Sequence, residues 1–181
     1  MKFGTGPLPV PVEGETRQRN FQRLLDQVKF LKESRFDYIM LGQHYFAQPL
    51  DLMHPIPTIA RLAADAQPMS LACLLLLPFY NPIELAEQLQ TLDVICGGNL
   101  TVTMAQGWKD DEFLAFGISK KQRASRLVEA LEVMNSLWTR ERTTYHGKYF
   151  NLTDVPRVGH PVQQPRPKIW IAANGDPGVK R

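Results

Sequence analysis

The sequence predicts an α/β fold in which a parallel sheet curves into a β/α barrel. Short apolar runs alternate with longer stretches of helical period, which is typical of βαβ units. The runs Tyr38 to Leu41 and Leu71 to Leu77 are apolar without interruption, as in strands buried on both faces. A complete TIM-type barrel needs roughly 250 residues, so the 181 residues of this chain predict only its N-terminal portion, about five strands.

Three strand–helix units are expected in the first half of the chain. Phe21, Leu24 and Val28 recur at spacings of three and four, which predicts a first helix that ends near Ser34. A Pro- and Gly-rich loop separates this helix from the strand before it. The strands are predicted at Lys2 to Thr5, Tyr38 to Leu41 and Leu71 to Leu77, and the second helix at about Pro57 to Ala66.

The third helix carries signals for both of its ends. Asn81 is a preferred N-cap residue, and Pro82 suits the first helical position because its missing N–H would have no partner there. Gly97 and Gly98 predict the C-terminal stop. A fourth strand is then expected at Leu100 to Met104.

The second half interrupts the alternation once. A short acidic helical segment, Asp110 to Phe116, precedes a long helix that Ser119 is expected to cap and that ends near Arg140. A hairpin or extended excursion is predicted at Thr143 to Leu152, followed by Pro-rich irregular chain. The fifth strand is predicted at Lys168 to Ala172.

These units predict a single domain, residues 1–181, as the N-terminal part of one barrel. Five strands leave two open edges and expose the apolar interior of the barrel. Either the chain is truncated after Arg181, or two copies pair edge to edge. We favour truncation, because the sequence stops where a helix should begin.

Composition narrows the class of protein. The net charge of +3 comes from scattered rather than clustered cations, so no nucleic acid partner is expected. Cys73 and Cys96 lie in apolar segments and predict small core residues in a reducing cytoplasm. No set of residues has the spacing of metal ligands, and no apolar run predicts a signal peptide or a membrane span.

Three loops that follow predicted strands carry candidate functional residues, since ligands of parallel β/α folds bind at the carboxyl ends of the strands. His44, after the second strand, could act as an acid or base or could be a satisfied loop residue. Gly107 and Trp108, after the fourth strand, could receive a planar ligand or merely cover the barrel mouth. Asn174 and Gly175 precede an expected helix, where backbone N–H groups favour a phosphate or simply form a turn.

A series of short motifs follows one order along the whole chain. They are Met1–Gly4, Phe36–Tyr38, His44–Phe46, Leu77–Pro82, Leu85–Glu87, Thr91–Asp93, Gly97–Leu100, Gly107–Trp108, Glu112–Phe113, Phe116–Gly117, Arg126, Glu129, Leu137–Trp138, Tyr149–Phe150 and Pro165–Ile171. In this order they resemble the bacterial luciferase-like family of flavin-dependent monooxygenases and deazaflavin-dependent reductases.

The resemblance implies a barrel, usually dimeric, that holds reduced flavin at the C-terminal mouth. His44 falls on the position that serves as a base in the luciferases. The residues that map near the flavin ring are Cys73, Leu74, Ala105, Gln106 and Gly107, while Asn174 and Gly175 map to the phosphate or ring-edge loop.

Some positions depart from the family pattern. Gln106 stands where luciferases place a basic residue that contacts the flavin, and Gln43 stands where an acid is common. Tyr45 and Asn81 replace common histidines, and Asn99 replaces a common arginine. These departures disfavour tight phosphate binding by the loop of Gln106 and also disfavour light emission.

The sequence therefore predicts a monooxygenase that uses reduced FMN and O₂ to oxygenate a small organic substrate, with the FMN supplied by a partner flavin reductase. One alternative is a hydride-transfer oxidoreductase that uses reduced deazaflavin. An alternative of another class is a non-catalytic flavin-binding half-barrel. A homodimer without nucleic acid or membrane partners is expected in each case.

Overall fold

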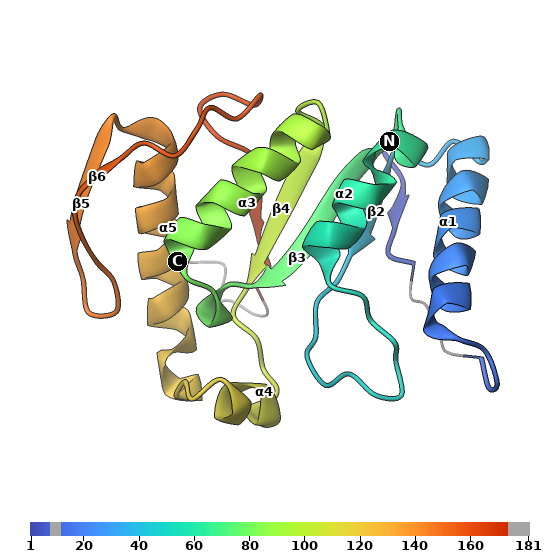
Figure 1. Ribbon diagram of the computed structural model, residues 1–181, viewed down its shortest axis with the longest axis horizontal. Coiled ribbons are helices and arrows are strands. Elements are labelled where there is room, and N and C mark those ends of the chain that lie inside the picture. Colours follow the sequence, from blue (N-terminus) through green and yellow to red (C-terminus); the bar gives the residue numbers. More distant parts are fainter. Residues whose placement is uncertain (8–11, 174–181) are drawn as a thin grey trace.

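The computed structural model describes residues 1–7 and 12–173 and contains a five-stranded parallel sheet (Figure 1). The strands stand in chain order and are β1 (Gly4–Thr5), β2 (Tyr38–Leu41), β3 (Ser70–Leu76), β4 (Leu100–Ala105) and β7 (Lys168–Ile171). Each strand is parallel to its neighbour. The predicted α/β fold with about five parallel strands is confirmed.

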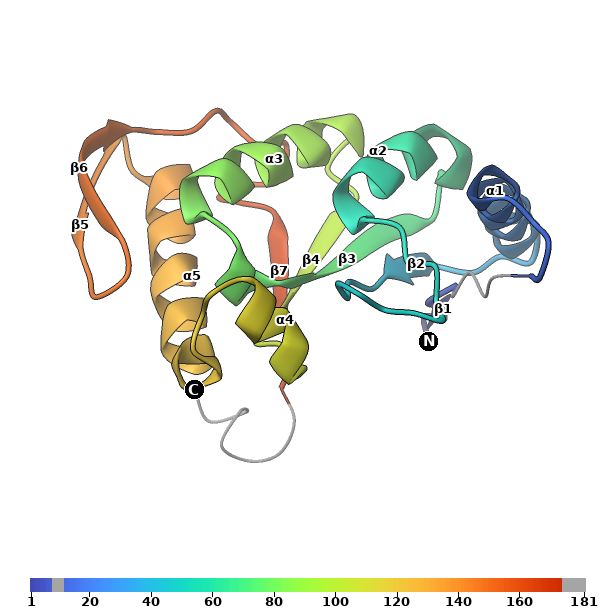
Figure 2. The same cartoon turned by 60° about the horizontal axis from the view of Figure 1, so that its bottom comes forward.

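The long helices pack against one face of this sheet (Figure 2). They are α1 (Arg17–Glu33), α2 (Pro55–Ala66), α3 (Pro82–Ile95) and α5 (Arg123–Thr139). Their apolar residues form one core with alternate strand residues, including Leu71, Cys73 and Leu75 of β3. The largest fully buried side chain is Trp138, whose indole N–H donates to the carbonyl of Ala86 at 3.1 Å.

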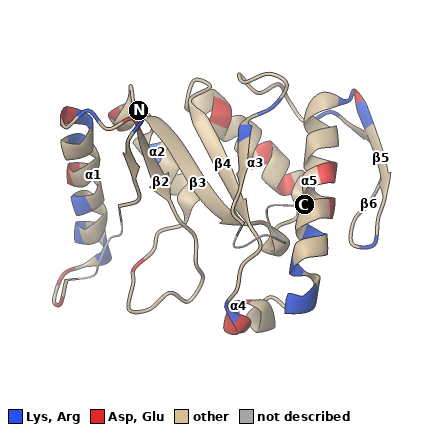
Figure 3. Cartoon of the chain, turned by 180° about the vertical axis from the view of Figure 1, so that it is seen from behind, with Lys and Arg blue, Asp and Glu red and all other residues tan. Residues whose placement is uncertain are grey.

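The opposite face of the sheet, the inner face of a barrel, is only partly covered by the described residues. Leu74 points to this face and is half-buried, whereas its neighbours Cys73 and Leu75 are fully buried among the helices. Trp170 is 41% exposed and contacts the edge of the Tyr38 ring. The strands carry almost no charge in the view from behind (Figure 3). Within the described residues, this face is therefore exposed in part, at Leu74 and Trp170, and buried in part, at Ala72 and Leu76.

The ends of α3 form as the sequence predicts. The side chain of Asn81 accepts the N–H of Ile83 at 2.9 Å, and Pro82 occupies the first turn. Gly98 adopts a φ of +77° and donates its N–H to the carbonyl of Asp93, which closes the helix.

Several predicted boundaries are wrong by one or more residues. Ser119 does not cap the long helix, because the 3₁₀ turn Lys120–Gln122 intervenes and the Ser119 side chain makes no capping bond. Helix α2 begins at Pro55 rather than Pro57, since prolines are tolerated throughout a first turn that lacks hydrogen-bond partners. Strand β3 ends at Leu76, and Leu77–Phe79 forms a 3₁₀ turn.

The predicted excursion after α5 is a hairpin of β5 (Arg142–His146) and β6 (Asn151–Pro156), longer than expected from the sequence. Its turn is fixed by Glu129 of α5, whose carboxylate accepts backbone N–H groups from Lys148, Tyr149 and Phe150 at 2.7 to 3.2 Å. The hairpin is thus anchored to the helix layer, away from the carboxyl ends of the parallel strands (Figure 1).

Candidate active site

The loops after the parallel strands open on a single edge of the sheet. The register places Leu41 beside Cys73, Leu76 beside Ala105, and Met104 beside Ile171. Residues that follow these strands therefore meet at one end of the sheet. The short helix α4 (Asp110–Ala115), which follows β4, reaches back to the loop after β2.

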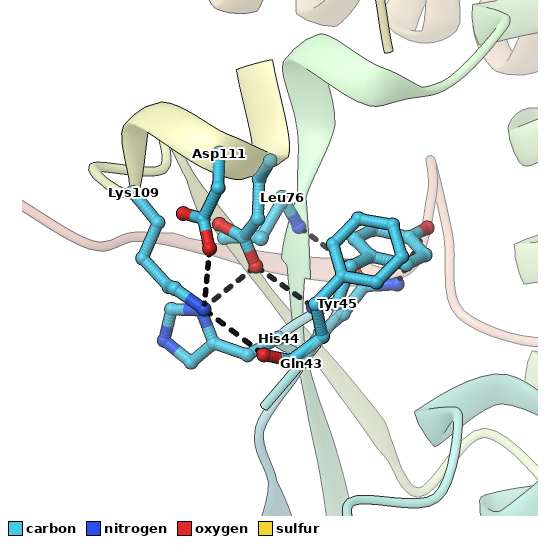
Figure 4. A network of polar contacts seen from close by, with 8 residues as sticks. Gln43, His44, Tyr45, Leu76, Lys109 and Asp111 are labelled. Atoms are coloured by element: carbon cyan, nitrogen blue, oxygen red, sulfur yellow. Dashed lines mark hydrogen bonds and ion pairs between the residues drawn. The ribbon is translucent and has the colours of Figure 1, made fainter. Parts of the chain in front are cut away.

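His44 lies in the loop that follows β2, two residues beyond Gly42. It pairs with a buried carboxylate from α4. Its Nδ1 lies 3.1 Å from Oε1 of Glu112, and the His44 side chain is 31% exposed while that of Glu112 is 0% exposed. The same oxygen accepts the backbone N–H of Tyr45 at 2.7 Å. Figure 4 shows His44 and Tyr45 in this polar network beside Lys109. Glu112 thus joins the loop after β2 to the helix after β4.

Two details set the electrostatics of the pair. The second carboxylate oxygen of Glu112, Oε2, is buried without a hydrogen-bond partner among the described residues. Lys109, the adjacent cation, donates to the carbonyl of Phe46 at 3.2 Å and lies 3.5 Å from Asp111 (Figure 4). Lys109 is therefore engaged by the loop and by Asp111, and His44 is the ionisable partner of Glu112.

A second polar cluster lies behind the same loop and is centred on Gln43. Its side-chain oxygen accepts the N–H of Leu76 at 2.9 Å, and its amide nitrogen contacts the hydroxyls of Tyr45 and Tyr80. Burial raises the pKa of both tyrosines, so they remain protonated at neutral pH. Burial lowers the pKa of His54, whose Nε2 is 2.9 Å from the Tyr80 hydroxyl. This cluster is neutral and fixes the loop that carries His44.

The surface next to His44 is largely apolar. Trp108 is 66% exposed, and its ring meets His44 edge-on with 5.8 Å between ring centroids. Gly107 has a φ of +76°, and a Cβ there would lie 3.3 Å from the Phe113 ring, so the position suits glycine. Ala105, Gln106 and Gly107 are half-buried at the end of β4. The arrangement combines an acid–base group with a flat apolar border.

The predicted site residues divide between the two faces of the sheet. Leu74 lies on the inner face, but the Cys73 side chain lies in the helix-facing core and is fully buried. Burial raises the pKa of the Cys73 thiol to about 12, so it stays an unreactive thiol at neutral pH. Both Cys73 and Cys96 are buried free thiols, as predicted. The predicted residues Asn174 and Gly175 fall outside the described residues.

The described residues contain neither a metal-ligand cluster nor a membrane-spanning helix. Residues 1–7 and 12–173 contain no group of three or more His, Cys, Asp or Glu side chains placed to hold a metal ion. Within the same ranges, no helix combines the length and apolar character needed to cross a bilayer.

The family model described as luciferase-like monooxygenase matches residues 1–181. An FMNH(2)-dependent dimethylsulfone monooxygenase of Pseudomonas putida is 29% identical over 83% of this chain and 42% of its own length. An F420-dependent glucose-6-phosphate dehydrogenase of Kineococcus radiotolerans is 29% identical over 97% of this chain and 53% of its own length.

A solved structure shows the same family likeness. The monooxygenase RslO1 from Streptomyces bottropensis superimposes with a TM-score of 0.85 at 28% identity, over 94% of this chain and 53% of that one. The protein therefore belongs to the luciferase-like monooxygenase family, whose members are monooxygenases or oxidoreductases. The chain spans about half the length of the curated relatives it matches.

Sequence reasoning found His44 but missed the partner that holds it. Glu112 was visible only as part of a motif, and the cluster of Gln43, His54 and Tyr80 was not foreseen. The sequence offers only one signal for Glu112, its place directly before Phe113 in an acidic segment, and its burial becomes clear only in the structure.

Proposed function

We propose that this chain forms part of a monooxygenase that uses reduced FMN and O₂ to oxygenate a small organic substrate. The observation that carries the proposal is His44, a partly exposed acid–base group at the strand ends, beside an apolar border and paired with a buried carboxylate. The similarity to an FMNH(2)-dependent monooxygenase supports this choice of cofactor.

The strand-end residues fit a flavin ring. Leu74, Ala105, Gly107 and Trp108 offer partly exposed apolar surface for a planar heterocycle, and the Gly107 backbone is free of a side chain. The amide of Gln106 can exchange hydrogen bonds with the polar edge of such a ring. No cation among these residues would neutralise a phosphate, so we assign the phosphate to residues other than these.

Bound reduced FMN would supply the electrons that activate O₂. The chain would supply the surroundings for that chemistry. Nε2 of His44 has no hydrogen-bond partner among the described residues, so it can hold or accept a proton at the mouth. Trp108 and Leu74 would exclude water from one side of the site. A separate flavin reductase would deliver the FMN, and we expect a homodimer in the cytoplasm.

A second candidate is hydride transfer to or from a deazaflavin. It is favoured by the 29% identity to an F420-dependent glucose-6-phosphate dehydrogenase over 97% of this chain. The same apolar border would hold a deazaflavin ring, and His44 would again act as the acid or base. A non-catalytic flavin-binding half-barrel would use this surface without turnover.

Anaerobic titration with reduced FMN and with reduced deazaflavin separates these candidates. We expect saturable binding of reduced FMN, and faster oxidation of substrate on admission of O₂ by the wild type than by H44Q, by about 100-fold or more. Preferential binding of deazaflavin would support the second candidate. Flavin binding with no turnover would support the non-catalytic one, and binding of neither cofactor would refute all three.

A further inference from the structure

We infer that Glu112 is a positioning residue for His44: when the imidazole is neutral, Glu112 selects the tautomer with the proton on Nδ1 and the free lone pair on Nε2. The inference rests on the proposed function, because it assigns how the acid–base group of that site is prepared. Glu112 would touch neither substrate nor cofactor.

The contact fixes the direction of the hydrogen bond. A carboxylate only accepts, so His44 Nδ1, 3.1 Å from Oε1, must be the donor. The backbone N–H of Tyr45 donates to the same oxygen at 2.7 Å and prevents the carboxylate from turning away. Because one ring nitrogen of a neutral imidazole is protonated, Nε2 is left as the acceptor.

The burial of Glu112 argues against a purely structural purpose. A fully buried carboxylate with an unpartnered Oε2 is unfavourable, and the N–H of Tyr45 needs only a neutral acceptor, so the loop contact alone does not require a charged group there. The charged groups near the pair are Lys109, Asp110 and Asp111. Lys109 is bound to the Phe46 carbonyl and Asp111, and Asp110 is bound to Lys120 at 2.9 Å. Besides the backbone N–H of Tyr45, the side chain that remains as a partner for Glu112 is His44, so the carboxylate that holds the loop also orients the histidine.

Nitrogen-15 NMR of the histidine rings tests the inference without any cofactor. The protein is labelled at its four histidines, and the His44 signals are identified by their loss in H44Q. At a pH where His44 is neutral, we expect a protonated Nδ1 and an unprotonated Nε2, the reverse of the tautomer that free histidine prefers in water. A wild-type His44 with its proton on Nε2 would overturn the inference, and this result does not depend on the folding of any Glu112 variant.

Two variants add a matched comparison. E112L removes the acceptor and should return His44 to the tautomer of free histidine, whereas D110N, in the same helical turn but 86% exposed, should leave it unchanged. If E112L folds, shown by an unchanged circular dichroism spectrum, and His44 keeps its proton on Nδ1, the inference fails. A merely structural role would lower the melting temperature of E112L without moving the tautomer.

The two proposals fail separately. If reduced FMN binds and H44Q loses turnover while wild-type His44 is protonated on Nε2, only the role of Glu112 is refuted. If the tautomer is as expected in wild type and changes in E112L, but no flavin binds, the positioning pair stands and the monooxygenase proposal is refuted.

Discussion

Gln43 is the residue on which the neutral cluster behind the site depends. It is 3% exposed and accepts the N–H of Leu76 while contacting Tyr45 and Tyr80. A buried amide with all its hydrogen-bond partners present stabilises the loop. Its removal leaves several buried polar groups without a hydrogen-bond partner. The position of His44 follows from this fixed loop.

Replacing Gln43 by Leu should therefore lower the free energy of unfolding by about 1–3 kcal/mol, because the Leu76 N–H loses its acceptor. Urea denaturation measures the change. Q22L is the control, since Gln22 is exposed and bonds only Asp26, and its effect should stay within about 0.5 kcal/mol. Equal effects in the two variants would contradict the assigned role of Gln43.

His54 gives a pH dependence whose sign follows from burial. Its pKa in the folded protein lies below the ordinary value, so the unfolded chain binds the proton more tightly. The free energy of unfolding should thus decrease as the pH falls from about 6.5 through the folded pKa. In H54Q this part of the decrease should vanish. Identical pH profiles of melting temperature for wild type and H54Q would rule out this contribution.

At this scale the sequence predicted His44 but could not predict Glu112. The strand before His44 is clear from its apolar run, and a histidine directly after such a strand points to the mouth of a parallel fold. The pairing with Glu112 spans 68 positions and depends on where α4 folds back, which no local pattern records. Cys73 shows a second limit of the sequence. Its expected place near the flavin ring came from its position along β3, whereas its side chain lies on the helix-facing side of that strand.

Among the elements, β3 separates the two sides of the fold most clearly. Leu75 is 0% exposed in the helix-facing core, while Leu74 lies half-buried on the inner face. Successive strand residues point to opposite faces, so a one-residue difference changes the environment completely.

L75K should lower the free energy of unfolding by more than about 4 kcal/mol, because it places an unpaired charge in the core. L74K should cost about 1 kcal/mol or less, since the inner face lets the ammonium reach water. Thermal melts of the two variants compare them directly. A similar loss in both would mean that the inner face of this chain is covered.

The turn of the hairpin is held by a carboxylate outside the strands. Glu129 accepts three backbone N–H groups of the turn, so E129A should lower the free energy of unfolding by about 1–3 kcal/mol. E141Q is the control, because Glu141 is 90% exposed in its ion pair and exposed pairs contribute less than about 1 kcal/mol. Calorimetry should show a lower melting temperature for E129A alone.

The order and type of the elements could be predicted because apolar periodicity decides them. The hairpin was predicted too short because its pattern is irregular. Its register shifts between Thr143 and Tyr145, and Asp154 adopts a φ of +53°, which interrupts the alternation expected of a strand. The start of α5 was misplaced for a similar reason, since a 3₁₀ turn has no distinct sequence period.

At the scale of the molecule, the described residues form one layer of helices on a sheet whose inner face they cover only in part. A hollow of about 520 Å³ lies at the end of the sheet opposite to His44. Its lining includes Tyr38, Thr101 and Trp170 and the charged residues Lys2, Arg35 and Lys168. The chain spans about half of its relatives, so a complete barrel would place further residues over this hollow. The candidate site is built from the strand ends of this half.

The most direct test of this account is an anaerobic fluorescence titration of wild type and L74K with reduced FMN. We expect saturable binding to the wild type and at least about tenfold weaker binding to L74K, whose charge would lie under the flat ring. The circular dichroism spectra of the two proteins should be the same. Saturable binding that L74K leaves unchanged would place the flavin elsewhere and contradict the account.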